Sequence, residues 1–377
     1  MSKRKQTSRK RRWGIIGGLV AAFVVVAGLL FYPTNCYAEV PGSAESLKPY
    51  VTVEGKKDTE KGAYMLTTVG VVGPASPALL LWAKMQPYSE IMSKQELMGD
   101  DDSKSYAFLQ EQYIKSAANN AVQAAFKAAG KPARMRHLGI YVMSLVKGSP
   151  FKDKLEVGDT ITALDGKRYT TANQYIKEIQ SRKIGSSLTL TFTRKGKVHT
   201  ATAKLMKLPG TNKAGIGIEL TEHTTISTTP KVKIDAGQIG GPSAGLMFAV
   251  QVYTELTNQH FRHGQKIAGT GTIDGDGNVG QIGGIDKKVY MANKEGAKVF
   301  FAPDQPATKQ IRKLDPGYEN NYAVAKRTAK QIKTKMKIVP VKTLKDALDY
   351  LRTINHRVVA VCGGFFLWCE GLAVLAG

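Results

Sequence analysis

Two short stretches decide how this chain is interpreted: residues 241–245 read GPSAG, and residues 283–288 read GGIDKK. The first stretch places Ser243 among small residues, just before an apolar segment that is expected to be helical to about Thr257. Small neighbours let a substrate backbone approach, and amides at a helix start have no intrahelical acceptor. We therefore predict that the backbone amides of Ser243 and Ala244 stabilise a developing oxyanion. Taken alone, the stretch fits a serine-capped turn at least as well.

The second stretch supplies a candidate base. A serine hydroxyl is a weak nucleophile until a neighbouring base takes its proton, and a lysine can do so when burial lowers its pKa. Residues 285–296 are expected to form a helix, whose apolar face comprises Ile285, Lys288, Val289 and Ala292. We predict that Lys288 is the buried base and that Lys287 is a solvated charge on the opposite side. The alternative for Lys288 is a surface lysine whose ammonium group reaches water.

These motifs resemble those of the Lon peptidase domain, and the resemblance extends over residues 214–352. It implies that Ser243 is the nucleophile and Lys288 the general base. Thr270, which opens the segment TGTI, is implied as a supporting residue hydrogen-bonded to the pair; an ordinary strand threonine is the alternative. Many Lon peptidases carry an acidic residue two positions before the proline, whereas this chain has Gly240. The hydrogen bonds around the dyad are therefore expected to differ.

The N-terminus predicts a membrane anchor. Residues 13–32 are an uncharged run of 20 residues with Trp13 and Tyr32 at its ends. At about 1.5 Å per residue a helix of this length spans about 30 Å, the thickness of a hydrocarbon core. Seven basic residues and no acidic ones lie in the first twelve positions, which favours a cytoplasmic N-terminus and a body outside the cell. A cleaved signal peptide is the alternative, although its apolar segment is normally only about 7–15 residues long.

A middle segment resembles a PDZ domain. Its short strands surround VGDTI at 157–161, a hairpin at 165–166 and a helix at 171–180. PDZ domains bind an extended peptide as an added strand. We predict that the edge of the peptide groove consists of Leu138, Gly139, Ile140 and Tyr141. A small β-domain without a ligand is the alternative.

The predicted fold class is α+β and multidomain, with an N-terminal transmembrane helix, a PDZ-like β-domain and a Lon-type α/β peptidase domain. The predicted domains are a cytoplasmic basic tail (1–12), a transmembrane helix (13–32), an extracellular segment of strands and a helix (39–130), the PDZ-like domain (131–208), the peptidase domain (209–353) and an atypical hydrophobic tail (354–377).

Composition restricts the partners and cofactors. The net charge of +24 suggests acidic partners, but the basic residues outside the first twelve positions are diffuse and lack interleaved aromatics, so nucleic acid is not expected. No His/Cys cluster has zinc spacing, and the acidic residues at 100–102 and 274–278 fit a helix start and a hairpin turn. The chain also lacks a phosphate-binding Gly-x-x-x-x-Gly-Lys loop. We therefore expect no metal, no cofactor and no requirement for ATP.

Together, the anchor, the PDZ-like segment and the two motifs resemble the membrane-anchored, PDZ-containing Lon-like serine proteases of Gram-positive bacteria. The SepM type of this family trims peptide pheromones outside the cell. The resemblance implies an ATP-independent endopeptidase with a Ser-Lys dyad that cleaves extracellular peptides or unfolded segments; an oligomer is left open. Two alternatives are a non-catalytic PDZ-type adaptor that binds peptides at the cell surface and a basic surface-binding protein attached to wall polymer or nucleic acid.

Overall fold

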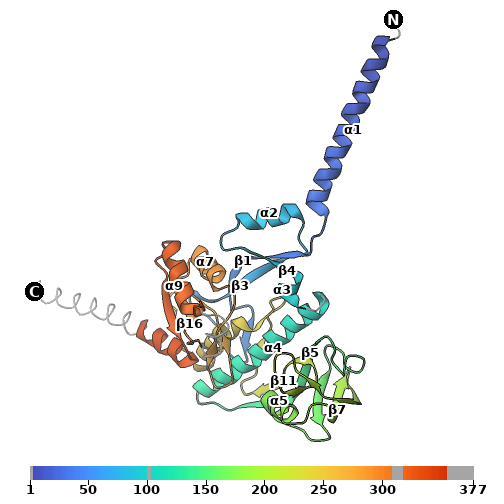
Figure 1. Cartoon of the computed structure of the whole chain (residues 1–377). Coiled ribbons are helices and arrows are strands. Elements are labelled where there is room, and N and C mark those ends of the chain that lie inside the picture. Colours follow the sequence, from blue (N-terminus) through green and yellow to red (C-terminus); the bar gives the residue numbers. More distant parts are fainter. Residues whose placement is uncertain (1–2, 100–102, 308–316, 355–377) are drawn as a thin grey trace, which may run out of the picture. The chain divides into compact units, whose positions relative to one another are not determined.

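The computed structural model describes residues 3–99, 103–307 and 317–354, with side chains from Trp13 onward except that of Lys104. The chain forms two compact units (Figure 1). We call residues 1–42 and 69–99 the anchor unit, and residues 43–68 and 100–377 the main unit. The predicted extracellular segment 39–130 is therefore divided between the two units rather than forming a domain. The predicted hydrophobic tail lies, from residue 355 onward, outside the described residues.

The anchor unit begins with a long helix and continues as a small α/β layer. Its elements are α1 (Lys3–Phe31), the first part of β1 (Cys36–Ser46), the last part of β3 (Ala63–Val72), α2 (Pro77–Met85), β4 (Glu90–Ser93) and α3 (Lys94–Met98). Within α1, Trp13–Phe31 is long and apolar enough to cross a membrane by length and composition. Strand β4 pairs antiparallel with residues 36–39 of β1. A small core of Ala38, Val40 and Ala83, with Val72 against it, joins α2 to this layer.

The main unit contains a parallel sheet whose two faces carry different helices. Its strands, in order, are β17 (Lys337–Val341), β16 (Val299–Pro303), β13 (Lys266–Gly269) and β3, and every pairing is parallel. Alternate residues of a strand point to opposite faces. In β16, Val299 and Phe301 join one hydrophobic cluster, whereas Phe300 and Ala302 join another. All five residues of β16 are buried, as expected for a parallel strand covered on both sides.

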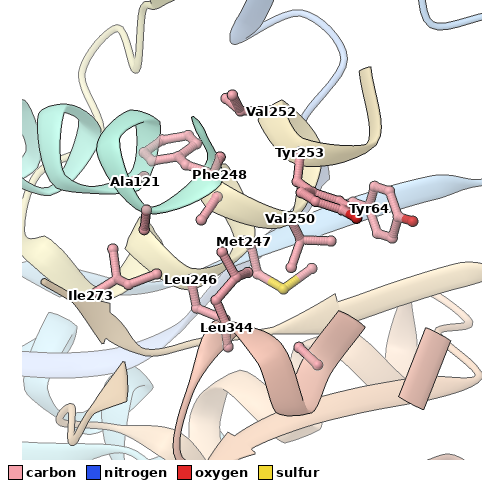
Figure 2. Close-up of a cluster of buried hydrophobic side chains, with 14 of the residues drawn as sticks. Tyr64, Ala121, Leu246, Met247, Phe248, Val250, Val252, Tyr253, Ile273 and Leu344 are labelled. Atoms are coloured by element: carbon pink, nitrogen blue, oxygen red, sulfur yellow. The ribbon is translucent and has the colours of Figure 1, made fainter. Parts of the chain in front are cut away.

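Helices α4 (Ser103–Ala128) and α6 (Gly245–Thr257) contribute to the first cluster, while α7 (Ile285–Lys294) and α9 (Asn321–Gln331) contribute to the second. Eleven of the thirteen residues of α6 are buried, so this helix is hydrophobic on nearly all sides and lies in the core. Figure 2 shows side chains of α6 packed around Ala121 of α4 and beside Ile273 and Leu344. The predicted helix from Ser243 to about Thr257 is therefore present, with a 3₁₀ turn, η1 (Pro242–Ala244), at its start.

The PDZ-like part of the main unit is an antiparallel sheet with one helix. The strand order is β11 (Ile218–Thr228), β5 (Ala133–Leu145), β6 (Thr160–Leu164), β7 (Ser187–Arg194) and β8 (Lys197–Lys204). Helix α5 (Ala172–Gln180) contributes Tyr175 and Ile179 to a separate core. The sheet includes β11, so it extends beyond the predicted boundary at residue 208. Three short strand pairs complete the unit: β2 (Val51–Val53) with β12 (Val232–Ile234), β9 (Met206–Lys207) with β10 (Ala214–Gly215), and β14 (Thr272–Ile273) with β15 (Val279–Gly280).

Candidate active site

Ser243 lies in the 3₁₀ turn that leads directly into α6. The turn begins after Gly241, whose φ of 83° is accessible to glycine at little cost. Helix α4 holds this loop, because the amide of Gly241 donates a hydrogen bond of 2.9 Å to the carbonyl oxygen of Gln110. Among the described residues, no side chain caps the turn. The amides at the start of a helix lack intrahelical acceptors, so the backbone around Ser243 and Ala244 suits an oxyanion.

Lys288 reaches Ser243 from α7. Its side-chain Nζ lies 2.6 Å from Ser243 Oγ and 3.2 Å from Thr270 Oγ1, and the residue is only 2% exposed. Its helical neighbours Ile285 and Val289 belong to the second hydrophobic cluster. Removal from water disfavours the ammonium form of a lysine. Position and burial are therefore those that a lysine base requires, and a surface lysine that reaches water is excluded.

Thr270 connects the serine turn to the lysine. Its fully buried hydroxyl donates a hydrogen bond of 3.0 Å to the carbonyl oxygen of Ser243 and accepts one from Lys288 Nζ. The amide of Gly271 donates to the same Ser243 carbonyl at 2.9 Å. Three residues separated by 27 and 18 positions thus meet at one point. The geometry can support proton transfer between Ser243 and Lys288, while the catalytic roles themselves stay predictions.

The sequence analysis was wrong about Lys287, which is 3% exposed rather than solvated. Its Nζ lies 3.8 Å from Asp286 Oδ1. Helix α7 packs against the sheet and against α9, so the apolar stripe inferred from periodicity underestimates the buried surface. Six of the ten residues of α7 are buried.

The sequence analysis also did not predict that α4 packs against the loop that carries Ser243. A Cβ atom on Gly240 would lie 2.7 Å from Gln110 Cβ, a separation at which one of the two must move. The position that is often acidic in Lon peptidases is therefore packed against a helix in this chain. Nothing local in residues 103–129 indicates this contact, because its partners are about 130 positions apart in the sequence.

The predicted groove edge at Leu138, Gly139, Ile140 and Tyr141 is also incorrect. These residues belong to β5, an interior strand with β11 on one side and β6 on the other. Ile140, for example, is opposite both Glu222 and Ile161. An interior strand offers no free edge to a peptide.

The free edge beside α5 belongs to β11. A cavity of about 200 Å³ lies between this edge and the helix, lined by Ile176, Ile179, Gln180, Leu208, Leu220 and residues 214–218. Gly217 precedes β11 with φ 70°, and a Cβ there would meet Ser149 at 2.9 Å. The signal for this edge was present in AGIGI at 214–218, a glycine-containing segment followed by the polar-apolar alternation of β11.

Acidic residues cluster in two segments of the sequence, 100–102 and 274–278. Residues 274–278 form the turn between β14 and β15, in which Asp274 Oδ1 accepts hydrogen bonds from the amides of Asp276 and Asn278. Residues 100–102 lie outside the described part of the chain. Within residues 3–99, 103–307 and 317–354, no group of three or more His, Cys, Asp or Glu side chains is arranged to hold a metal.

Residues 127–205 match the family model of the PDZ domain, which confirms the predicted PDZ-like domain. Among solved structures, the PDZ domain of the SdrC-like protein of Listeria monocytogenes is 33% identical to this chain, and that of the SdrC-like protein of Listeria innocua is 30% identical. Each comparison covers 22% of this chain, with 90% and 96% of those chains respectively, and each has a TM-score of 0.22.

Curated relatives carry the name Lon protease. One from Aster yellows witches'-broom phytoplasma is 28% identical over 109 residues, and one from Campylobacter concisus is 31% identical over 108 residues. Each similarity covers 29% of this chain, which spans only 12% and 11% of those relatives. The chain is thus an α+β protein with a PDZ domain and a partial similarity to Lon proteases.

Proposed function

We propose that this protein is a membrane-anchored, ATP-independent serine endopeptidase in which Ser243 is the nucleophile and Lys288 the general base. One observation carries the proposal: the buried Nζ of Lys288 lies 2.6 Å from Ser243 Oγ at the start of a core helix. A nucleophile and a base within hydrogen-bond distance form the minimal unit of serine catalysis. The partial similarity to Lon proteases supports the same reaction class.

In the proposed reaction, the neutral amine of Lys288 accepts the proton of Ser243 Oγ as this oxygen bonds to the substrate carbonyl carbon. The amides of Ser243 and Ala244 donate to the resulting oxyanion. The C–N bond then breaks, and the Lys288 ammonium returns its proton to the leaving amine. In the second half, Lys288 takes a proton from water, the hydroxide attacks the acyl ester, and Ser243 Oγ leaves with that proton.

We further propose that the PDZ domain binds an extended peptide along β11 and supplies it to this site. The free edge of β11 and the apolar wall of α5 support this role. The basic residues before Trp13 favour a cytoplasmic N-terminus, so the peptidase is proposed to lie outside the cell. Its substrates would then be extracellular peptides or unfolded segments, with peptide pheromones as one case.

The test is a mixed peptide library incubated without ATP with the full chain in nanodiscs and analysed by mass spectrometry. Ser243→Ala and Lys288→Ala are run beside the wild type. Cleavage by the wild type alone is expected, because loss of either member disables the pair. Equal cleavage by wild type and Ser243→Ala would refute the proposed nucleophile.

A peptide-binding adaptor is the second candidate, and the open groove beside β11 is the observation that favours it. The same library distinguishes the two functions. Peptides that are retained by all three proteins and cleaved by none would identify an adaptor.

A further inference from the structure

Helix α2 exposes an apolar face. Its sequence, PALLLWAKM, contains one charged residue, Lys84. Leu81, Trp82 and Met85 are 64%, 44% and 76% exposed, whereas Ala83 is fully buried in the core of the anchor unit. Positions i, i+1 and i+4 lie on one side of a helix. The three exposed side chains of α2 therefore form a single outward face, opposite the residue that fixes the helix to its unit.

Exposed apolar side chains are concentrated in the anchor unit. Beyond Tyr32, the described part of the chain exposes seven large hydrophobic residues, and five of them lie between residues 69 and 99. Those five are Val71, Leu81, Trp82, Met85 and Ile91. Single exposed hydrophobic residues need no explanation, but a concentration of them marks an interaction surface.

The structure ties α2 to the end of α1. The amide and the hydroxyl of Thr34, three residues after α1, both donate to the carbonyl oxygen of Ala75, at 3.0 and 2.6 Å. The Ala75 amide donates to the carbonyl oxygen of Cys36 at 2.9 Å. Helix α2 begins two residues later, where Ser76 Oγ accepts from the Leu79 amide. Figure 1 accordingly shows α2 beside the C-terminal end of α1, with which it is in contact.

We propose that α2 is a second membrane contact, lying on the bilayer surface where α1 ends, with Leu81, Trp82 and Met85 inserted among the lipids. This inference rests on the proposed membrane anchoring by α1. A span that ends at Phe31 places Thr34 and the attached start of α2 at the level of the lipid headgroups. Tryptophan favours that level, and interfacial helices bury an apolar face while a lysine reaches the phosphates. The occupant of the apolar face is therefore a lipid surface.

The test uses the full chain in nanodiscs, with Cys36, Cys362 and Cys369 replaced by alanine and one spin label introduced per protein. Labels at L81C and M85C report on α2, and a label at L19C reports on the middle of α1. A label at V198C is the matched control, because Val198 is an exposed apolar residue of the PDZ sheet. The ratio of accessibility to oxygen over accessibility to a water-soluble nickel chelate is measured at each site.

We expect the ratio at Leu81 and Met85 to exceed that at Val198 several-fold and to remain below that at Leu19. If the Leu19 label is in lipid while both α2 labels match Val198, the inference is overturned and the anchor stands. If the label at Leu19 has the accessibility ratio of a water-exposed site, both the proposed membrane anchor and this inference are refuted. A second copy of the chain would be the occupant if the α2 labels have the same accessibility ratio as the Val198 label and show strong dipolar broadening between two protein molecules. That result would contradict the proposal.

Discussion

Thr270 contributes one hydroxyl to both halves of the predicted dyad, because it donates to the Ser243 carbonyl and accepts from Lys288 Nζ. Valine matches its shape without the hydroxyl, so Thr270→Val should loosen both residues. A displacement of reacting groups by about 1 Å can cost about 100-fold in rate. We expect Thr270→Val to lower kcat by about 10- to 100-fold with little change in KM.

Thr270→Ser is the control, because it keeps the hydroxyl and should retain most of the activity. Steady-state kinetics on a peptide from the library compare the two variants. A valine variant as fast as the wild type would show that the hydrogen bonds of Thr270 do not position the dyad.

The neighbouring lysines of α7 allow a paired test. Both are buried; Lys288 Nζ lies 2.6 Å from Ser243 Oγ, whereas Lys287 Nζ lies 3.8 Å from Asp286 Oδ1. Methionine has a similar length and no basic nitrogen, so Lys288→Met should abolish peptide cleavage, whereas Lys287→Met should preserve it. Rates are compared after thermal unfolding shows that both variants are folded. An inactive Lys287→Met beside an active Lys288→Met would transfer the role of base to Lys287.

At the scale of single residues, the sequence predicted the position of a side chain correctly where the expected chemistry and the helical periodicity agreed. The face of α7 that carries Lys288 follows from its spacing to Ile285 and Val289, and the structure places Lys288 Nζ against Ser243. The burial of Lys287 was not predictable in the same way. It depends on α9 and the sheet covering α7 from more than one side, which no spacing within residues 285–296 encodes.

At the scale of elements, α4 is packed against the loop that carries Ser243. A Cβ on Gly240 would meet Gln110 Cβ at 2.7 Å, so even alanine must push the loop away from α4. We expect Gly240→Ala to reduce kcat by about tenfold or more, because the serine would be displaced from Lys288. Kinetics of the variant on the library-derived peptide measure this effect.

Gly283→Ala is the matched control, since an added Cβ at Gly283 has nothing within 4 Å and its φ is not in the left-handed region. Its activity should remain near that of the wild type. Equal losses in both variants would mean that general glycine effects, and not the contact with α4, determine the rate.

The groove beside β11 predicts which isoleucines bind peptide. Ile176 of α5 lines the cavity, whereas Ile184 is exposed elsewhere on the same domain. A lysine at position 176 would lose hydration when the peptide covers it. Ile176→Lys should weaken peptide affinity by at least about tenfold, for which about 1.4 kcal/mol is sufficient, and Ile184→Lys should not. Fluorescence anisotropy of a labelled peptide from the library measures both; unchanged affinity in Ile176→Lys would place the groove elsewhere.

The order of PDZ elements was predictable because turns and strand alternation are local signals, and the family match at 127–205 confirms the domain. The pairing of β5 was not. The composition of residues 138–141 fits an edge strand and an interior strand equally well. These residues become interior because β11, about 80 residues later in the sequence, pairs with β5.

At the scale of the whole molecule, a buried ion pair links distant loops of the main unit. Arg262, 2% exposed, forms a two-pronged pair with Asp58 and lies over the ring of Tyr64. Burial would raise the pKa of Asp58, but hydrogen bonds from Arg262 and Gln251 and the nearby positive charges outweigh it and lower the pKa to about 2. A carboxylate whose pKa is depressed by folding stabilises the folded state above its unfolded pKa of about 3.9.

That stabilisation should therefore be lost as the pH falls from about 5 to about 2, and it amounts to about 2 kcal/mol. Asp58→Asn removes the titrating group. At about pH 5 the wild type should have a higher free energy of unfolding than the variant, and this gap should become smaller as the pH falls to about 2. Urea unfolding at a series of pH values measures the gap. A gap that does not change with pH would contradict the assigned pairing.

The long-range organisation could be foreseen only in part. The apolar run at 13–32 is self-contained and predicts the apolar part of α1, Trp13–Phe31, but not the start of the helix at Lys3. In contrast, residues 39–130 read as a separate segment, although β3 pairs with β13 and α4 packs on α6. Such contacts join residues more than 100 positions apart, so they depend on the tertiary structure and leave no periodic trace in the sequence.

The most direct test of the Ser-Lys assignment is covalent labelling with a peptidyl fluorophosphonate, mapped by peptide mass spectrometry on the full chain. An activated serine attacks such a probe, whereas an ordinary serine does not. We predict one adduct, on Ser243, that disappears in Lys288→Met and persists in Lys287→Met. An unlabelled Ser243 in the folded wild-type protein, or equal labelling of Ser243 in wild type and Lys288→Met, would contradict the assignment of Lys288 as the base.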